Sequence, residues 1–263
     1  MWIKRLRKLV YGPMTILMLA LALFGVYGFF TAPARAARAQ SAIEEDLRKK
    51  AEQIEANKEA MLAEREARKN EQNQQEVPAD PTALWNRYSD ASQVDILGIG
   101  DSVMVSAINE FYAAFPNGYF DAVFGRTIYD GIAALRYYAD SGQLGDVMVI
   151  GLATNVPVIY DEDIRAIIDL CQGRPVFFLN AYGVSNNANE VINRVLPEYK
   201  NAYLVDWASY FLQNRHLIQS DGLHPNHDGS VILCNIIAGR INETVLVQPP
   251  YLDHGEKRVP EVK

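Results

Sequence analysis

The sequence predicts an α/β protein: a flavodoxin-like, three-layer α/β/α sandwich with a parallel sheet of roughly five strands, preceded by a transmembrane helix and a helical stalk. Two observations predict this class. Short apolar runs and helical stretches alternate five times after Trp85, the pattern of a parallel sheet covered on both faces. In addition, 49% of the 263 residues are hydrophobic, enough for the core of one good-sized domain.

The N-terminal segment predicts a membrane anchor over 1–38. It has no charged residue from Leu9 to Ala34, which is 26 residues, whereas a spanning helix needs about 20. Basic residues precede this run, so we expect a cytoplasmic N-terminus and an extracytoplasmic remainder. The small residues of "APARAARA" leave a cleaved signal peptide open as the alternative, although its apolar region is usually shorter.

Residues 39–80 predict a charged helical stalk or linker. The segment is rich in Glu, Lys, Arg, Ala and Gln, which favour helices. Leu47, Ile54 and Met61 recur every seven residues, but the companion positions are mostly polar, so the coiled-coil pattern is weak and a solvated single helix is favoured. Pro78 and Pro81 end the stalk. The predicted domain then spans 81–245, followed by a C-terminal tail, 246–263.

Within that domain, the apolar runs and the stretches with helical spacing give a consistent order of elements. The expected strands are 94–100, 119–125, 146–152, 174–180 and 202–207, and the expected helices are 102–115, 127–142, 161–173, 188–199 and 228–241. Sites in parallel sheets form beyond the carboxyl ends of the strands. Ser102, Gly125 and Asn155 each follow a strand, so we expect them at one edge.

Charge and cysteine content exclude some functions. From residue 81 onward, 12 basic residues stand against 21 acidic ones, and such a domain repels a phosphate backbone, so no nucleic-acid partner is expected. Cys171 and Cys234 lie in apolar helical patterns. Buried free thiols are favoured, with pairing in an oxidising compartment left open. No Cys or His spacing indicates a metal, so no metal or cofactor is expected.

Ser102 in "DILGIGDSVMVSA" fits two roles. A serine between a strand and a helix is a common position for a nucleophile, but it is also an ordinary helix N-cap. A nucleophilic serine needs a base, usually His, held by an acid. Asp221 precedes His224 by three residues in "SDGLHPNHDGS", a step that lets the carboxylate reach the imidazole Nδ1. The segment follows the last expected strand and returns the chain to the edge that bears Ser102.

These residues resemble the SGNH, or GDSL-like, hydrolases. The four matching blocks are "GDSV" at 100–103, Gly125, "GLATN" at 151–155 and "DGLHPN" at 221–226. The resemblance implies that Ser102 is the nucleophile, His224 the general base and Asp221 its orienting acid. It also implies an oxyanion hole formed by the backbone N–H groups of Ser102 and Gly125 and the side-chain amide of Asn155. Each such donor stabilises the transition state by about 3 kcal/mol.

Two departures from the usual SGNH blocks indicate a resemblance to one particular group of these proteins. Val103 replaces the usual Leu, and Val156 replaces the acid that usually follows the Asn. Both resemble extracytoplasmic SGNH domains linked to membrane acyltransferases, including peptidoglycan O-acetyltransferases. The resemblance implies an esterase or O-acyltransferase acting on an acylated cell-envelope polysaccharide or peptidoglycan, with a multi-pass membrane protein as a candidate acyl-supplying partner. The alternative is a non-catalytic envelope-binding or scaffold module.

Three polar features near the expected site have simpler interpretations. Asp101 is expected to cap the helix after the first strand rather than take part in chemistry, because carboxylates stabilise helix N-termini. Arg126 is expected to be an exposed arginine, with a contact to a substrate sugar as the alternative. The acidic run at 161–163 is explained by the macrodipole of the helix that it begins.

Overall fold

The computed structural model describes residues 2–73 and 88–246, with side chains described for 33–68, 70 and 88–246. It divides the chain into two compact units, the first ending at Glu45 and the second beginning at Asp46. The second unit contains a five-stranded sheet in the order β2-β1-β3-β4-β5. The strands, all parallel, are β1 (Ile96–Gly100), β2 (Tyr119–Ala122), β3 (Val147–Gly151), β4 (Val176–Leu179) and β5 (Ala202–Val205). The predicted α/β class with a parallel five-stranded sheet is confirmed.

The register of the central strands sets the position of the site. Gly100, the last residue of β1, pairs with Ala122 of β2 and with Gly151 of β3. The three strands therefore end level with one another, and the loops that follow them begin side by side. All residues of β1, β2 and β3 are buried, as expected for a sheet with helices on both faces.

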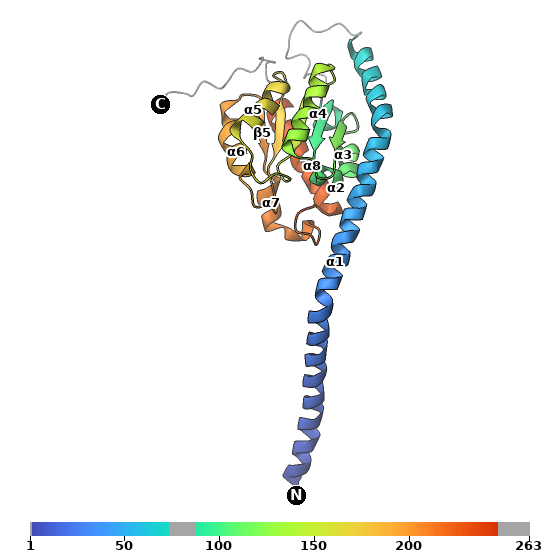
Figure 1. The fold of residues 1–263 in the computed structure, drawn as a ribbon, viewed down its shortest axis with the longest axis vertical. Helices are drawn as coiled ribbons and strands as arrows, with labels where there is room; N and C mark the ends of the chain where they lie inside the picture. The colour runs from blue at the N-terminus through green and yellow to red at the C-terminus, as the bar shows by residue number, and fades with distance from the viewer. Residues whose placement is uncertain (1, 74–87, 247–263) are drawn as a thin grey trace, which may run out of the picture. The chain divides into compact units, whose positions relative to one another are not determined.

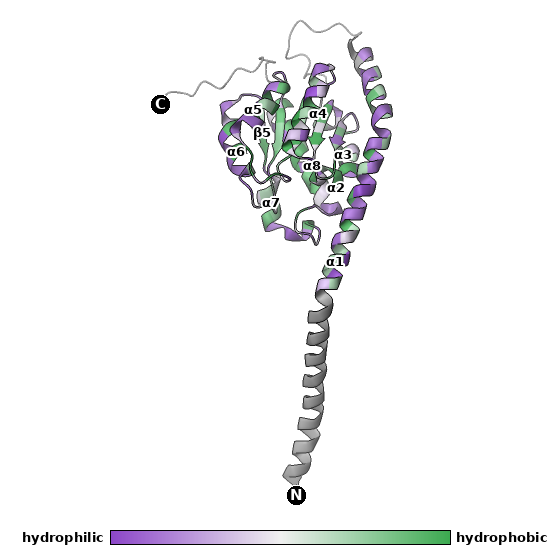
Figure 2. Ribbon diagram, in the orientation of Figure 1, coloured by the Kyte–Doolittle hydropathy of each residue, from purple (hydrophilic) through white to green (hydrophobic). Residues whose placement is uncertain are grey.

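Helices cover both faces of the sheet (Figure 1). One face carries α4 (Ile128–Asp140), α5 (Asp161–Leu170) and α6 (Ala188–Val195), which pack against one another in sequence order. On the other face, α3 (Ile108–Ala114) packs against α8 (His227–Ile241). The strands between them are mostly apolar (Figure 2). One core cluster forms where the strands meet α4, α5 and α6, and α3 and α8 contribute further buried residues, among them Phe111 and Ile237.

Two elements differ from the sequence expectation. The single helix expected over 102–115 is broken at Ala107 into α2 (Ser102–Ser106) and α3, because the Ala107 backbone (φ −101°, ψ 12°) is not helical. The strand expected to reach Trp207 ends at Val205. Asp206 instead caps α7 (Trp207–Gln213), accepting a hydrogen bond from the Ser209 backbone N–H at 3.1 Å.

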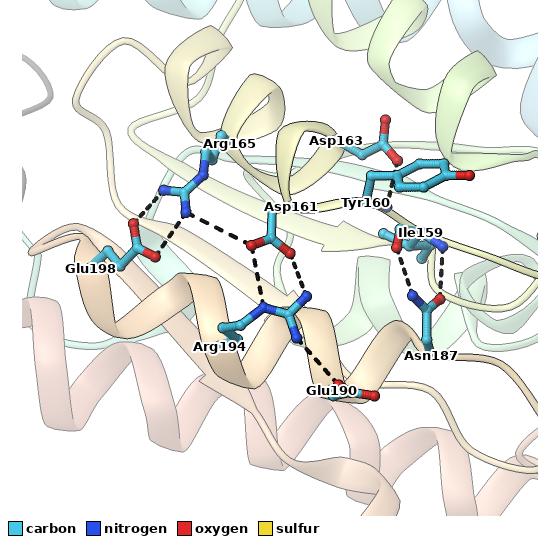
Figure 3. Close-up of polar contacts among 9 residues, drawn as sticks. All are labelled: Ile159, Tyr160, Asp161, Asp163, Arg165, Asn187, Glu190, Arg194 and Glu198. Atoms are coloured by element: carbon cyan, nitrogen blue, oxygen red, sulfur yellow. Dashed lines mark hydrogen bonds and ion pairs between the residues drawn. The ribbon is translucent and has the colours of Figure 1, made fainter.

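An ion-pair network joins α5 to α6 and to the segment that follows α6 (Figure 3). Arg165 pairs with Glu198, and Arg194 donates to Asp161 at 2.5 Å. Asp163 accepts a hydrogen bond from the Tyr160 backbone N–H at 2.9 Å. The acidic run at 161–163 therefore does more than favour the helix macrodipole: two of its members make specific contacts.

One long helix, α1 (Trp2–Asn73), precedes the sheet. From Asp46 onward it belongs to the same compact unit as the sheet. Leu47 and Ile54 are buried, and Arg65 is 2% exposed and pairs with Asp95. The expectation of a fully solvated stalk is wrong for this face of the helix, because its apolar seam packs within the unit.

The uncharged run of the predicted anchor (1–38), residues 9–34, lies almost entirely outside the residues whose side chains are described, and the predicted tail, 246–263, lies outside the described residues from 247 onward. Among the described residues, no helix has the length and apolarity needed to cross a bilayer. Cys171 and Cys234 are both buried free thiols, which confirms that prediction. Burial raises the pKa of Cys234 to about 12.

Candidate active site

Ser102 is the first residue of α2, two residues after the end of β1. The tight strand-to-helix turn is held by Asp101. Its backbone N–H donates to the Gly151 carbonyl at 2.9 Å, and its carboxylate accepts from the Val103 N–H at 2.9 Å. The expected capping role of Asp101 is confirmed. The turn places the Ser102 hydroxyl beyond the carboxyl end of the sheet, at the N-terminus of a helix.

His224 and Asp221 lie in the loop before α8 and reach the same edge. His224 Nε2 lies 2.8 Å from Ser102 Oγ, and its Nδ1 lies 2.6 Å from Asp221 Oδ2. Both the histidine and the serine are buried. With the Nδ1 proton donated to the carboxylate, Nε2 is the acceptor that faces the hydroxyl.

Asp221 is held in place by its own loop. Its Oδ1 accepts hydrogen bonds from the backbone N–H groups of Leu223, at 2.9 Å, and His224, at 3.1 Å. Burial alone would raise the pKa of Asp221, but hydrogen bonds from the His224 ring and from these backbone groups outweigh it, and the pKa lies below its usual value. The carboxylate is therefore ionised at neutral pH and orients the imidazole.

Gly125 lies in the turn after β2. Its φ of +75° is a left-handed conformation that glycine adopts without strain, and a Cβ built there meets no atom within 4 Å. The turn is anchored by a hydrogen bond from the Val123 N–H to the Gly100 carbonyl at 3.1 Å. Among the described residues, the backbone N–H groups of Ser102 and Gly125 donate to no protein acceptor, so both are available to a bound group.

Asn155 follows β3 and faces the turn after β2. Its Nδ2 donates to the Arg126 carbonyl at 3.1 Å. This contact uses one of the two amide hydrogens and leaves the other for a ligand. The hydrogen bond joins the segment that bears Asn155 to the segment that bears Gly125.

The loop from Ala153 to Tyr160 is supported by two asparagines that precede α6. Asn186 Nδ2 donates to the carbonyls of Ala153, at 2.8 Å, and Val156, at 3.1 Å. The Asn187 amide pairs with both backbone groups of Ile159, at 2.8 and 2.7 Å (Figure 3). The loop is therefore fixed through its main chain, although it belongs to no strand.

Two further contacts at the site were not predicted. The hydroxyl of Thr154 donates to the second oxygen of Asp101, and burial raises the pKa of that carboxyl. Arg126, expected to be exposed, is 9% exposed and pairs with Asp121. The expectation for Arg126 is wrong because its side chain folds back under the turn, a contact that five-residue spacing in the sequence does not reveal.

The described residues contain no group of three or more His, Cys, Asp or Glu side chains arranged to hold a metal ion. What the site does contain is a hydroxyl, an imidazole and a carboxylate in one hydrogen-bonded series, with unused N–H donors on neighbouring segments. Chemically, this arrangement can deprotonate a serine and stabilise an oxyanion.

Comparisons with known proteins give two sequence relatives. The chain is 29% identical over 157 residues to the O-acetyltransferase OatA of Staphylococcus aureus, a match covering 58% of this chain and 26% of OatA. It is 25% identical over 146 residues to the protein YrhL of Bacillus subtilis, covering 54% of this chain and 23% of YrhL. The chain thus spans about a quarter of the length of the curated relatives that it matches. No family model matches.

Among solved structures, the C-terminal catalytic domain of peptidoglycan O-acetyltransferase A from Streptococcus pneumoniae is similar, with a TM-score of 0.52 and 16% identity. The similarity covers 58% of this chain and 94% of that domain. At this identity, the similarity shows a shared fold. The sequence similarity to OatA and YrhL, together with the shared fold, confirms the resemblance drawn from the four blocks to peptidoglycan O-acetyltransferases.

Proposed function

We propose that this protein is a membrane-anchored, extracytoplasmic serine esterase or O-acyltransferase acting on an ester, most simply an acetyl ester, of a cell-envelope carbohydrate. The observation that supports this proposal most directly is the hydrogen-bonded series from Asp221 through His224 to Ser102, with steps of 2.6 and 2.8 Å. The contacts fall within the range in which a base can take the proton of a nucleophile.

The reaction follows from the geometry. As Ser102 Oγ attacks the acyl carbonyl, its proton passes to His224 Nε2, and the imidazolium is stabilised by Asp221. The tetrahedral intermediate collapses, His224 gives the proton to the leaving alcohol, and the acyl group remains on Ser102 as an ester. A second hydroxyl, from water or from a sugar, then attacks this ester as His224 takes its proton. When this second intermediate collapses, His224 returns the proton to Ser102 Oγ, which frees the serine and releases the acyl group as an acid or as a new ester.

The negative charge that develops on the carbonyl oxygen needs donors. The proposed donors are the backbone N–H groups of Ser102 and Gly125 and the second amide hydrogen of Asn155. Their fit is supported by the level ends of β1, β2 and β3 and by the absence of protein acceptors for both backbone groups among the described residues. Losing one such donor costs about 10²–10³ in kcat.

The substrate class comes from the relatives. OatA of S. aureus is an O-acetyltransferase, and the pneumococcal domain is named for peptidoglycan. We extend the acetyl group and the cell-wall glycan to this chain. The uncharged segment 9–34 would hold the domain at the outer face of the membrane. A separate multi-pass protein would supply acyl groups if the reaction is transfer rather than hydrolysis.

The test uses the full chain in detergent micelles with an activated acetyl ester, with and without cell-wall oligosaccharides. A fluorophosphonate probe is expected to label the wild type and not Ser102→Ala. Free acetate as the product identifies a hydrolase, and acetylated sugar identifies a transferase. Folded wild-type protein that neither labels nor releases acetate contradicts the proposal and favours the non-catalytic envelope-binding module.

A further inference from the structure

Arg126 directly follows the glycine whose N–H is a proposed oxyanion donor, yet its side chain does not face solvent. The guanidinium Nη2 donates to Asp121 Oδ1 at 2.7 Å, and Nη1 donates to the backbone carbonyls of Asp121, at 2.5 Å, and Gly100, at 3.5 Å. Asp121 is 4% exposed. The side chain therefore reaches the ends of both β1 and β2 from beneath the turn.

The backbone of Arg126 contacts a third segment, the one that bears Asn155. The Arg126 carbonyl accepts the hydrogen bond from Asn155 Nδ2 at 3.1 Å, and its N–H donates to the Val123 carbonyl at 3.2 Å. One residue thus contacts the end of the strand before Ser102, the strand before Gly125, and the side chain of Asn155. These are the three segments that bear the proposed oxyanion donors.

The chemistry of the guanidinium makes these contacts rigid. A buried charge has to keep its partners, since leaving it unpaired is strongly unfavourable. The planar fork of Arg also fixes direction as well as distance, which an ammonium does not. Asp121 is itself held from the other side, because its Oδ2 accepts from the Tyr138 hydroxyl at 2.9 Å. Burial and the nearby Asp121 raise the pKa of Tyr138, which therefore stays a donor.

We propose that Arg126 is a positioning residue for acyl transfer: its guanidinium, paired with Asp121, holds the turn so that the Gly125 N–H and the Asn155 amide meet the oxyanion together. This inference rests on the proposed function and adds to it a residue that positions two donors of the oxyanion hole. Arg126 itself touches neither the substrate nor the reacting atoms, and acts through the donors on either side of it.

The role predicts a specific kinetic pattern. Arg126→Lys keeps the charge but has one nitrogen in place of the planar fork, so it does not reproduce the geometry in which Nη1 and Nη2 bind Asp121 and the two carbonyls. We expect kcat to fall by about 10²–10³, the effect of misplacing one oxyanion donor, with KM changed by less than about threefold. A trifluoromethyl ketone, whose adduct with Ser102 presents an oxyanion, should lose affinity by the same factor. The pH dependence of kcat/KM should match that of wild type, because the contacts of His224 with Ser102 and Asp221 are unaffected.

Stability has to be separated from positioning. Rates are therefore expressed per active site, titrated with the fluorophosphonate probe, on the full chain in detergent. Arg65→Lys is the matched control: it makes the same exchange in another buried Arg–Asp pair, in which Arg65 binds Asp95, the residue just before β1 and so at the opposite end of that strand from Ser102. We expect it to destabilise the fold yet keep kcat within about threefold. Asp121→Asn, which keeps the shape of the partner, serves as a second variant if Arg126→Lys does not fold, and should lower kcat and ketone affinity together by about tenfold or more.

Two results overturn the inference. One is an Arg126→Lys or Asp121→Asn protein whose turnover and ketone affinity per active site match those of wild type. The other is a loss of turnover in the Arg65→Lys control as large as that in the Arg126 variant, which would show a general effect of destabilisation. An inactive wild-type chain contradicts the proposed function itself, and so differs from both.

Discussion

Replacing Arg65 by Met tests whether the last part of α1 is a structural element of the domain. Arg65 is 2% exposed, and its Nε and Nη2 bind the two oxygens of Asp95 at 2.9 and 3.1 Å. Its Nη1 donates to the Gln143 carbonyl. Removing one partner of a buried, hydrogen-bonded ion pair costs about 3–5 kcal/mol, because the other charge stays in a poor environment.

The assay is urea unfolding of the full chain in detergent, followed by tryptophan fluorescence. With a slope of about 2–3 kcal/mol per molar urea, the expected loss lowers the midpoint by about 1–2.5 M. The matched control is Arg68→Met, on the same helix. Among the described residues, Arg68 has one hydrogen bond, to Asn117 at 3.4 Å, and it is only partly buried, so its loss should cost less than about 1 kcal/mol.

Equal midpoints for the two variants would refute the reasoning, since they would show that the Arg65 pair adds nothing to the stability of the unit. The expected result has a practical consequence for fragment design. A soluble fragment that begins at residue 81 lacks Leu47, Ile54 and Arg65, all buried, and should be less stable than one that begins at Asp46.

Three further predictions concern the site. Gly125→Ala should destabilise the fold by only about 1–2 kcal/mol, since its Cβ meets no atom at φ +75°, yet it should lower kcat as the turn shifts. Thermal melts and acetyl-ester kinetics on the same samples compare the two effects. A loss of stability without a loss of turnover would count against the Gly125 N–H as an oxyanion donor. Thr154→Val removes the hydroxyl that binds Asp101 and should lower the free energy of unfolding in urea by about 1–3 kcal/mol. Thr154→Ser keeps the hydroxyl, and its free energy of unfolding should stay near that of wild type. Similar free energies for the two variants would contradict a stabilising hydrogen bond to Asp101. Because the pKa of Asp221 in the fold lies below its usual value of 3.8, its contribution to stability is complete above that value and disappears as pH falls through the folded pKa. Asp221→Asn should therefore weaken the fall in stability at acid pH, measured by melts between about pH 2 and 7, and an unchanged acid limb would show that the Asp221 contacts do not contribute.

The order of the elements could be predicted from the sequence because each buried strand is a short apolar run. The strands of the structure all lie inside the predicted ranges. The break at Ala107 could not be predicted, since both halves of 102–115 have helical spacing and the turn depends on how α3 packs against α8. The missed helix α7 did have a signal: Asp206 stands three residues before Ser209, the spacing of an N-cap.

The residues of the candidate site also differ in whether they could be predicted from the sequence. Ser102, Asp221 and His224 could be found because their spacing and motifs lie along the chain. Arg126 could not, because its pairing with Asp121 depends on the path of the turn between them. The heptad of Leu47, Ile54 and Met61 did indicate an apolar seam, but its partner is the domain itself, as the buried Arg65–Asp95 pair shows.

The asparagines before α6 have a consequence for how this protein could diversify. Asn186 and Asn187 bind carbonyl and amide groups of the loop between β3 and α5, and none of its side chains. Because these hydrogen bonds involve only main-chain atoms of the loop, they hold its path whichever side chains it carries. Val158 and Tyr160, 42% and 57% exposed, can be exchanged without loss of any of these bonds, so the surface beside Asn155 is open to evolutionary change while the amide of Asn155 keeps its place.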